Sequence, residues 1–351
     1  MEFKGRIQRL IKKLDEKSLD SFLVTTDKNV AYLTGFRGED SILLLTRKKV
    51  FFLTDSRYLE EARRNIEGCE ITLVRGSTYD TIQDIAAKAR LKKLGFESMN
   101  LHYEVYKRLK TMLKKTRLAG LQDMVEAMRE IKDRQEIEAI KRAAKLTSSI
   151  CKEFFKSIEF GRTEADLASR LKIAFIEKGA SAAFDPIVAS DGNAALPHAI
   201  PGSDKIKKDC VFMADLGARL NGYNSDMTRT TLFGKVSAKA KKIYDIVKRA
   251  QELAIKAVAP GVKASSIDSA ARGYIESKGF GRFFGHSVGH GVGLDVHEWP
   301  SISGHSHALL REGMVFTVEP AIYIPSLLGV RLEDMVLVTR GGCEVITGGA
   351  G

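Results

Sequence analysis

Cysteine is scarce in this sequence. The 351 residues include four, Cys69, Cys151, Cys210 and Cys343, and none of them forms a CxxC pair. Pairs at that spacing mark zinc ribbons and thioredoxin-type redox sites, so both classes of site are excluded. We expect the four to be free thiols that pack as small apolar side chains in a reducing compartment.

Long hydrophobic runs are also missing. No stretch approaches the roughly 18 consecutive apolar residues that a membrane-spanning helix needs. The first six residues lead into an amphipathic segment rather than into the apolar core of a signal peptide. With 7 prolines, 44% hydrophobic and 28% charged residues, the composition is that of an ordinary globular protein. These features predict a cytoplasmic protein with no membrane partner.

Basic residues outnumber acidic ones and give a formal net charge of +12. Basic domains can bind nucleic acid, so this class of partner has to be weighed. The lysines and arginines are spread over short clusters, as in 107–115 and 239–242, and no aromatic residues alternate with them as in RNA-binding motifs. We therefore interpret them as a solvated surface rather than a nucleic-acid site.

An α/β domain with a mixed sheet is predicted for residues 1–125. Apolar segments 41–46 and 50–54 form a hairpin across a basic turn, and Asp55–Ser56 is expected to cap the helix that follows. Further strands are predicted at residues 21–26, 71–74 and 93–96. No catalytic constellation occurs in this domain, and His102 stands alone, as expected of a surface or helix-capping residue.

Residues 126–351 form the second predicted domain, which begins with helices. Apolar residues recur at helical spacing from about Asp133 to Ile158, and Thr163-Glu164 caps the next helix. Two more helices are expected at 237–257 and 264–278, between strands. Two helix pairs that flank strand pairs indicate a duplicated half.

The first chemical signal is Asp215, within the apolar segment 211–216. A carboxylate in such surroundings is costly unless something pairs with it. The strand turns at Asn221-Gly222, a strong two-residue hairpin signal that sets Asp215 opposite Thr228. Asp226 then lies diagonally from Asp215 on the same face, roughly 7–8 Å away at the backbone. The two carboxylates can therefore converge on a cation.

A glycine-rich segment supplies the second signal. His286, His290 and His297 fall within twelve residues, and glycines lie between them. These glycines let the backbone approach a ligand closely and disfavour a helix. A dinucleotide-binding loop is a poor match, because the third glycine of that motif is missing.

Two more acidic residues complete the pattern. Glu319 ends an apolar strand, and Arg331 and Glu333 alternate with apolar residues, so that both point the same way. Any one such carboxylate could simply face solvent. Four of them with a glycine-framed histidine form an oxygen-rich set that suits manganese or cobalt, with zinc and iron as alternatives. Two such ions can activate a shared water and polarise a carbonyl, which is hydrolytic chemistry.

In their order and spacing, these residues resemble the metal ligands of the pita-bread metallopeptidases. The surrounding phrases resemble the aminopeptidase P and prolidase branch over essentially the whole chain; they are Phe184–Ser190, Ala195–His198, Gly289–Gly293 and Thr317–Pro320. The resemblance implies an α+β fold, in which a creatinase-type α/β domain precedes a pita-bread domain with a curved antiparallel sheet backed by helices. It also implies a homodimer in which the N-terminal domain covers the partner's pocket.

The resemblance further implies two divalent metal ions per chain. Asp215 would bind one ion, Asp226 and Glu333 would bridge both, and His290 and Glu319 would each bind one. Glu319 would also take a proton from the bridging water.

Other residues take supporting roles by the same resemblance. His198 and His297 would hydrogen-bond the substrate and the tetrahedral intermediate, and His286 would line the pocket. Arg331 would orient Glu333 and its neighbours, as expected around a metal site. A purely structural loop histidine is the alternative interpretation of His198 and His286. His305 and His307 fit no role and are expected to be exposed.

The implied activity is hydrolysis of the peptide bond between an N-terminal residue and proline by a hydroxide bound to two metal ions. Proline matters because its tertiary amide and fixed backbone defeat general peptidases. Ser301 stands where some prolidases carry an arginine suited to a dipeptide's carboxylate, so dipeptidase and aminopeptidase P activities both stay open. Two alternatives share the fold: a creatinase-like amidinohydrolase, against which the intact ligand set counts, and a non-catalytic binding module, which the positive charge leaves open.

Overall fold

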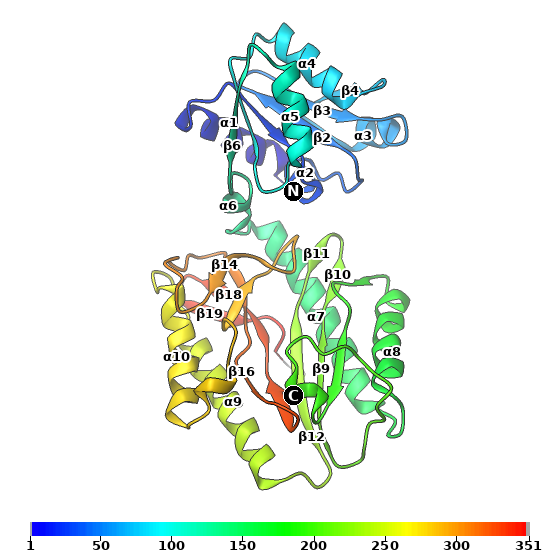
Figure 1. The fold of residues 1–351 in the computed structure, drawn as a ribbon, viewed down its shortest axis with the longest axis vertical. Coiled ribbons are helices and arrows are strands. Elements are labelled where there is room, and N and C mark those ends of the chain that lie inside the picture. Colours follow the sequence, from blue (N-terminus) through cyan, green and yellow to red (C-terminus); the bar gives the residue numbers. More distant parts are fainter. Residues whose placement is uncertain (1, 349–351) are drawn as a thin grey trace. The chain divides into compact units, whose positions relative to one another are not determined.

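The computed structural model describes residues 2–348, which fold into two compact units, residues 2–129 and 130–348 (Figure 1). We call them the N-terminal unit and the C-terminal unit. The boundary predicted between residues 125 and 126 falls at the start of α6 (Glu126–Arg129). No helix of the described residues combines the length and the apolar composition that a membrane span requires.

One six-stranded sheet organises the N-terminal unit, with the strand order β4-β3-β2-β1-β5-β6. The pairs β1/β2 and β2/β3 are antiparallel, whereas β3/β4, β1/β5 and β5/β6 are parallel, so the predicted mixed sheet is confirmed. The strands are β1 (Ser21–Val24), β2 (Ile42–Thr46), β3 (Val50–Thr54), β4 (Glu70–Leu73), β5 (Lys93–Glu97) and β6 (Arg117–Leu121). The remaining helices are α1 (Phe3–Glu16), α2 (Asp27–Thr34), α3 (Leu59–Asn65), α4 (Thr78–Lys88) and α5 (Tyr103–Met112).

The helix cap predicted at Asp55–Ser56 is wrong, because α3 begins at Leu59 after a turn at residues 56–58. The Asp55 carboxylate accepts hydrogen bonds from the backbone N–H of Arg57 at 2.8 Å and from its guanidinium at 2.9 and 2.6 Å. These bonds use the carboxylate to stabilise the turn instead of a helix end. His102 is exposed just before α5, and its side chain makes no capping hydrogen bond.

Short antiparallel sheets and long helices build the C-terminal unit. The helices are α7 (Arg134–Lys156), α8 (Glu164–Glu177), α9 (Ala238–Lys256) and α10 (Ala264–Ser277), with 3-10 turns η1 (Asn193–Ala195) and η2 (Gly281–Phe283). The strands are β7 (Ser181–Ala182), β8 (Ile187–Ser190), β9 (Cys210–Leu216), β10 (Ala218–Leu220), β11 (Tyr223–Asn224), β12 (Met227–Phe233), β13 (Gly289–Gly291), β14 (Glu298–Ile302), β15 (Val315–Val318), β16 (Ala321–Ile324), β17 (Leu328–Arg331), β18 (Asp334–Thr339) and β19 (Gly342–Val345). They pair in the orders β11-β10-β7, β12-β9-β8, β14-β13-β15-β18-β19 and β16-β17.

Two apolar cores hold these helices against the strands. Phe154 of α7 and Leu171 of α8 pack in one core with Phe212 of β9. The second core packs α9 and α10 on the later strands, with Ile267 and Phe316 among its buried members. In Figure 1, α8 and the α9–α10 pair lie on either side of the strands. Each buried side chain of this size contributes about 1.5–3 kcal/mol, so the cores fix the strands that carry the functional groups.

The two helix pairs of the C-terminal unit repeat one another. Gly161 and Gly261 precede α8 and α10 with φ of 91° and 83°, and Gly179 and Gly279 follow these helices with φ of 73° and 83°. The residue before each helix also forms an isolated β-bridge, in Thr163↔Lys205 and Lys263↔Leu309. Matching backbone at a constant offset is what a duplicated half requires, as the helix–strand pattern indicated.

Thr163 is expected to stabilise α8 as its N-cap. Its Oγ1 accepts from the backbone N–H of Asp166 at 3.0 Å, and the Asp166 carboxylate accepts from the Thr163 N–H at 3.3 Å. Thr163→Val removes the side-chain acceptor and should lower the free energy of unfolding of the C-terminal unit by about 1 kcal/mol. The single tryptophan, Trp299, lies in this unit, so its fluorescence during urea denaturation reports the change. The control is Ser169→Ala, exposed in the same helix, which should not destabilise; an equal loss in both variants would contradict the capping role.

Candidate active site

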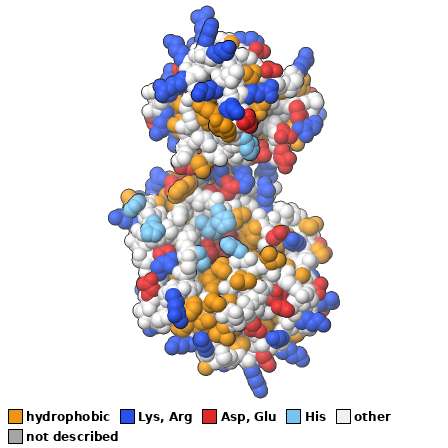
Figure 2. Space-filling view, in the orientation of Figure 1, with side chains coloured by type: hydrophobic (Ala, Val, Ile, Leu, Met, Phe, Trp, Pro, Cys, Tyr) orange, Lys and Arg blue, Asp and Glu red, His pale blue; other side chains and the backbone are white. Residues whose placement is uncertain are grey.

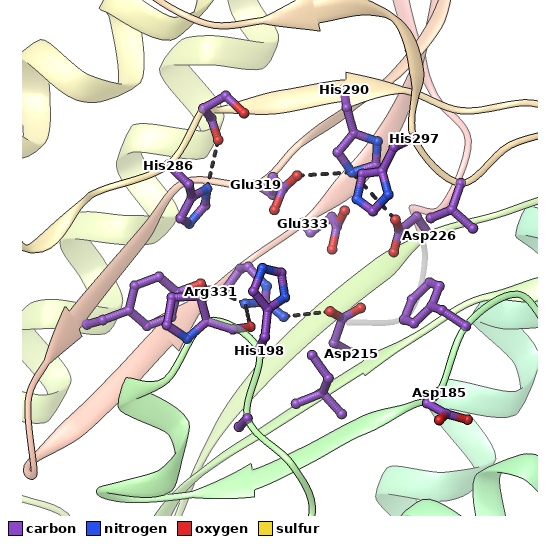
Figure 3. A pocket seen from close by; sticks show the side chains of 17 residues that line it. Asp185, His198, Asp215, Asp226, His286, His290, His297, Glu319, Arg331 and Glu333 are labelled. Carbon is purple, nitrogen blue, oxygen red and sulfur yellow. Dashed lines mark hydrogen bonds and ion pairs between the residues drawn. The ribbon is translucent and has the colours of Figure 1, made fainter. Parts of the chain in front are cut away.

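One cavity of about 510 Å³ in the C-terminal unit collects every site residue that the sequence predicted (Figure 3). The residues come from segments far apart in the chain. Asp215 belongs to β9, His290 to β13 and Arg331 to the end of β17. The members of the set are His198, Asp215, Asp226, His286, His290, His297, Glu319, Arg331 and Glu333. His305 and His307 are exposed and do not line the cavity, as expected.

The β9–β12 hairpin supplies two of the carboxylates. Thr228 pairs with Asp215, in the register that the Asn221-Gly222 turn predicted. Both turn residues have positive φ, 52° and 80°, which two-residue hairpin turns require and which Asn and Gly tolerate. Asp215 and Asp226 are 8% and 5% exposed, so the hairpin holds two nearly buried acidic groups at one end of the cavity.

His290 meets carboxylates from other segments. Its Nε2 lies 3.3 Å from Glu319 Oε1 and 3.7 Å from Asp226 Oδ2. Ligand atoms of Asp226, His290 and Glu333 lie within 4.8 Å of one another. The other ring nitrogen, Nδ1, lies 3.2 Å from the Gly291 carbonyl oxygen. A carbonyl oxygen only accepts, so Nδ1 carries a proton, and Nε2 is the ring nitrogen that faces the carboxylates.

A single guanidinium links the carboxylates on the other side. Arg331 donates from Nη2 to Asp215 Oδ2 at 2.5 Å, from Nη1 to Tyr323 Oη at 2.6 Å, and from Nε to Thr228 Oγ1 at 2.9 Å. Thr228 extends this series of hydrogen bonds, because its hydroxyl donates to Glu333 Oε2 at 2.6 Å. Arg331 therefore orients Asp215 directly and Glu333 through one hydroxyl.

The four carboxylates are poorly satisfied by the protein alone. Burial, and then the charges of neighbouring carboxylates, raise the pKa of both Asp226 and Glu333 well above the ordinary values. Within residues 2–348, buried Asp215 Oδ1 and Glu333 Oε1 have no hydrogen-bond partner. Buried carboxylate oxygens without a partner are costly. A set of carboxylate oxygens with one imidazole nitrogen suits divalent cations, so the residues present fit such ions.

The other histidines differ in their surroundings. The ring centroid of His286 lies 5.6 Å from that of Tyr323, and the ring centroid of His297 lies 4.2 Å from that of His290. Burial lowers the pKa of His286 and of His297, so both are neutral at pH 7. His198 is exposed at the cavity. Figure 2 shows histidine side chains gathered on one face of the C-terminal unit, with hydrophobic side chains beside them.

The residues that support the site carry no recognisable signal in the sequence. Tyr323 lies in an apolar strand, where an aromatic residue carries no sign of a polar role. Lys132 and Glu298, the residue that follows His297 in the chain, form an ion pair at 2.8 Å, with side chains 1% and 8% exposed. In the sequence Lys132 is one more basic residue near the domain boundary. Only the burial of Lys132 indicates that it has an acidic partner, and this burial cannot be predicted from the neighbouring sequence.

Comparisons with known proteins show the family to which the chain belongs. Residues 138–340 match metallopeptidase family M24, and residues 6–131 match the creatinase/prolidase N-terminal domain. The chain is 36% identical over 347 residues to the Xaa-Pro dipeptidase of Pyrococcus furiosus, which covers 98% of each chain. It is similar to the solved Xaa-Pro dipeptidase from Bacillus anthracis, with 36% identity and a TM-score of 0.96 over 99% of this chain and 98% of that one. It is also similar to the solved X-Pro aminopeptidase from Thermotoga maritima, with 35% identity and a TM-score of 0.90 over 97% of each. The chain therefore belongs to metallopeptidase family M24, with a creatinase/prolidase N-terminal domain, and is a metal-dependent peptidase.

Proposed function

We propose that this enzyme hydrolyses the peptide bond between an N-terminal residue and a following proline, with two divalent cations bound at the cavity. The ions would be held by Asp215, Asp226, His290, Glu319 and Glu333. The observation that carries the proposal is the convergence of these side chains, with Asp215 Oδ1 and Glu333 Oε1 lacking hydrogen-bond partners among the described residues. The names of two relatives, an Xaa-Pro dipeptidase and an X-Pro aminopeptidase, support the choice of bond.

The bound cations would lower the pKa of a shared water and polarise the scissile carbonyl. Glu319 is the residue suited to take the proton of the attacking water. Its Oε1 accepts a 3.2 Å hydrogen bond from Thr317 Oγ1 and lies beside His290. Burial of Glu319 opposes its ionisation. The hydrogen bond from His290 and the positive charge of His290 outweigh this effect and lower the pKa of Glu319. The carboxylate is therefore ionised and held in place before the reaction.

The cavity also fits the proline that follows the scissile bond. Proline presents an apolar ring and no backbone N–H, so it needs an apolar wall rather than a hydrogen-bond acceptor. The neighbouring rings of His286 and Tyr323 supply such a wall, and Phe184, Ile187 and Val296 add apolar lining. Neutral His297, together with His198, would hydrogen-bond the carbonyl oxygens of the substrate.

The charge of the lining favours peptides longer than two residues. A dipeptide brings its free carboxylate close to the cleaved bond and gains from a nearby cation. Among the described residues that line the cavity, Arg331 alone carries a permanent positive charge. All three of its nitrogens are already hydrogen-bonded, including an Nη1 contact of 3.1 Å to the Pro197 carbonyl oxygen. Ser301 adds no charge, so a longer peptide, whose carboxylate lies farther away, meets a smaller penalty.

The proposal predicts cleavage of Ala-Pro-Ala-Ala with release of alanine. Metal-free protein would be reconstituted with manganese, cobalt or zinc in turn and offered Ala-Pro-Ala-Ala, Ala-Pro and Ala-Ala. We expect the tetrapeptide to have a higher kcat/KM than Ala-Pro, and Ala-Ala to remain intact. Faster cleavage of Ala-Pro would make the enzyme a dipeptidase and overturn the argument from charge. No cleavage of either proline substrate by metal-loaded protein would refute the proposed bond specificity.

The proposed bridging role of Glu333 gives a second prediction. Glu333→Gln keeps the shape but removes the charge, so hydrolysis should fall by more than 100-fold and metal content should drop, both measured on the same preparation. His290→Ala should lose at least one metal ion per chain by elemental analysis. Glu312→Gln is the matched control, because Glu312 is exposed and outside the cavity. Full activity and full metal content in Glu333→Gln would rule out the bridging role.

A further inference from the structure

The loop that carries His198 is closed by one buried carboxylate. Glu164, the first residue of α8, is 0% exposed. Its Oε1 accepts from the backbone N–H of Ser190 at 2.8 Å, and its Oε2 accepts from Asn193 Nδ2 at 2.6 Å and from the N–H of Gly202 at 3.2 Å. Glu164 therefore binds the beginning and the end of the segment 190–202, and His198 lies between the two attachments.

The loop that carries His286 is held by a second buried carboxylate. Asp268 of α10 is 1% exposed and accepts two hydrogen bonds from Arg272, at 2.8 and 2.9 Å. Asp268 also accepts from the N–H of Val288 at 3.2 Å. Arg272 then donates to the carbonyl oxygens of Phe284 at 2.9 Å and His286 at 2.7 Å. Asp268 and Arg272 thus bind the backbone before and after His286 in the chain. Arg272 also binds the carbonyl oxygen of His286 itself.

The two arrangements occupy comparable places in the duplicated fold. Both carboxylates lie in the first turns of the second helix of a pair, after the positive-φ glycines Gly161 and Gly261. When α8 and α10 are aligned by the glycines that precede them, Glu164 and Asp268 differ by one helical turn. The two side chains therefore leave similar faces of their helices. Each carboxylate accepts from at least one backbone N–H of a loop that reaches the cavity, and Figure 3 shows His198 and His286 entering the cavity from different segments.

We propose that Glu164 and the Asp268–Arg272 pair are positioning residues, which set the histidine rings of His198 and His286 against the substrate. Neither group lines the cavity, so neither touches the substrate. A buried carboxylate is costly unless its hydrogen bonds are satisfied. Glu164 is satisfied by its loop, and Asp268 is satisfied by Arg272 and the N–H of Val288. Each loop can therefore keep one conformation without help from the substrate. This inference rests on the proposed function, because the two histidines contact the substrate only in that proposal.

A double-mutant cycle tests the inference. Glu164→Gln should lower kcat/KM for Ala-Pro-Ala-Ala by roughly 10–100-fold, the range for residues that orient the groups of a metal site. In a His198→Ala background the same change should alter kcat/KM by less than about 2-fold, since the ring that Glu164 positions is absent. In a His286→Ala background it should keep its full effect. Asp268→Asn should show the reverse pattern, with its effect lost in His286→Ala and kept in His198→Ala.

Two measurements independent of activity separate positioning from general damage. The chain has seven histidines, so long-range ¹H–¹⁵N spectra of their rings can be assigned residue by residue. Glu164→Gln should shift the His198 resonances and leave those of His286 unchanged, and Asp268→Asn should do the opposite. The affinity of metal-free protein for manganese, by calorimetric titration, should stay within about 2-fold of wild type in Glu164→Gln, because no proposed ligand lies in segment 190–202.

The outcomes are distinguishable. If wild-type protein cleaves no proline substrate, the proposed function fails, while the ring spectra still test the positioning. If wild-type protein cleaves and Glu164→Gln has the same effect with and without His198, the positioning role is overturned. Unmoved His198 resonances in Glu164→Gln would overturn it too. Should Glu164→Gln not fold, Asn193→Ala removes one bond to the same carboxylate and should give the same pattern with a smaller loss.

Discussion

Repulsion among four carboxylates in one small cavity is the constraint on which the rest of this enzyme depends. Two like charges 4 Å apart repel by about 4 kcal/mol at an effective dielectric constant of 20. Asp215, Asp226, Glu319 and Glu333 line one cavity, and burial adds to the cost of charging them. A fold that keeps such groups together must compensate them. Divalent cations do so, which is why the unsatisfied oxygens of Asp215 and Glu333 are the strongest indication of metal binding in this site.

The surrounding structure limits how far these groups can move apart. The β9–β12 hairpin fixes Asp215 and Asp226, and Arg331 binds Asp215 and, through Thr228, Glu333. Two apolar cores hold the helix pairs against these strands. Rigid placement is useful for a hydrolase, because the attacking water, the proton acceptor and the scissile carbonyl must meet in one geometry. His198 and His286 stand on loops, where hydrogen bonds from helix side chains supply the rigidity that a strand would otherwise give.

Much of this could be predicted because the signals were local. A two-residue Asn-Gly turn sets the hairpin register, so the pairing of Asp215 with Thr228 followed from counting residues, and the structure confirms it. The mixed sheet, the capped start of α8 at Thr163 and the family also followed from the sequence. Metal roles, the choice between manganese, cobalt, zinc and iron, the homodimer and the cytoplasmic location stay predictions.

The parts that escaped prediction depend on long-range contacts. Asp55 is a local exception: it looks like a helix cap, but its carboxylate is taken by the side chain of Arg57 in the same turn, which no propensity rule foresees. Lys132 and Glu298 are 166 positions apart in the chain and become partners only when β14 reaches the start of α7. Glu164 was assigned to a helix start, yet its second function is to close a loop 26 to 38 residues away.

The most direct test of the central claim is a crystal structure of manganese-saturated protein with anomalous data recorded at the manganese edge. We predict two anomalous peaks per chain, both within bonding distance of the set Asp215, Asp226, His290, Glu319 and Glu333, with Asp226 and Glu333 touching both ions. Saturated protein with no peak among these side chains, or with its manganese elsewhere, would contradict the claim that the cavity is a two-metal centre.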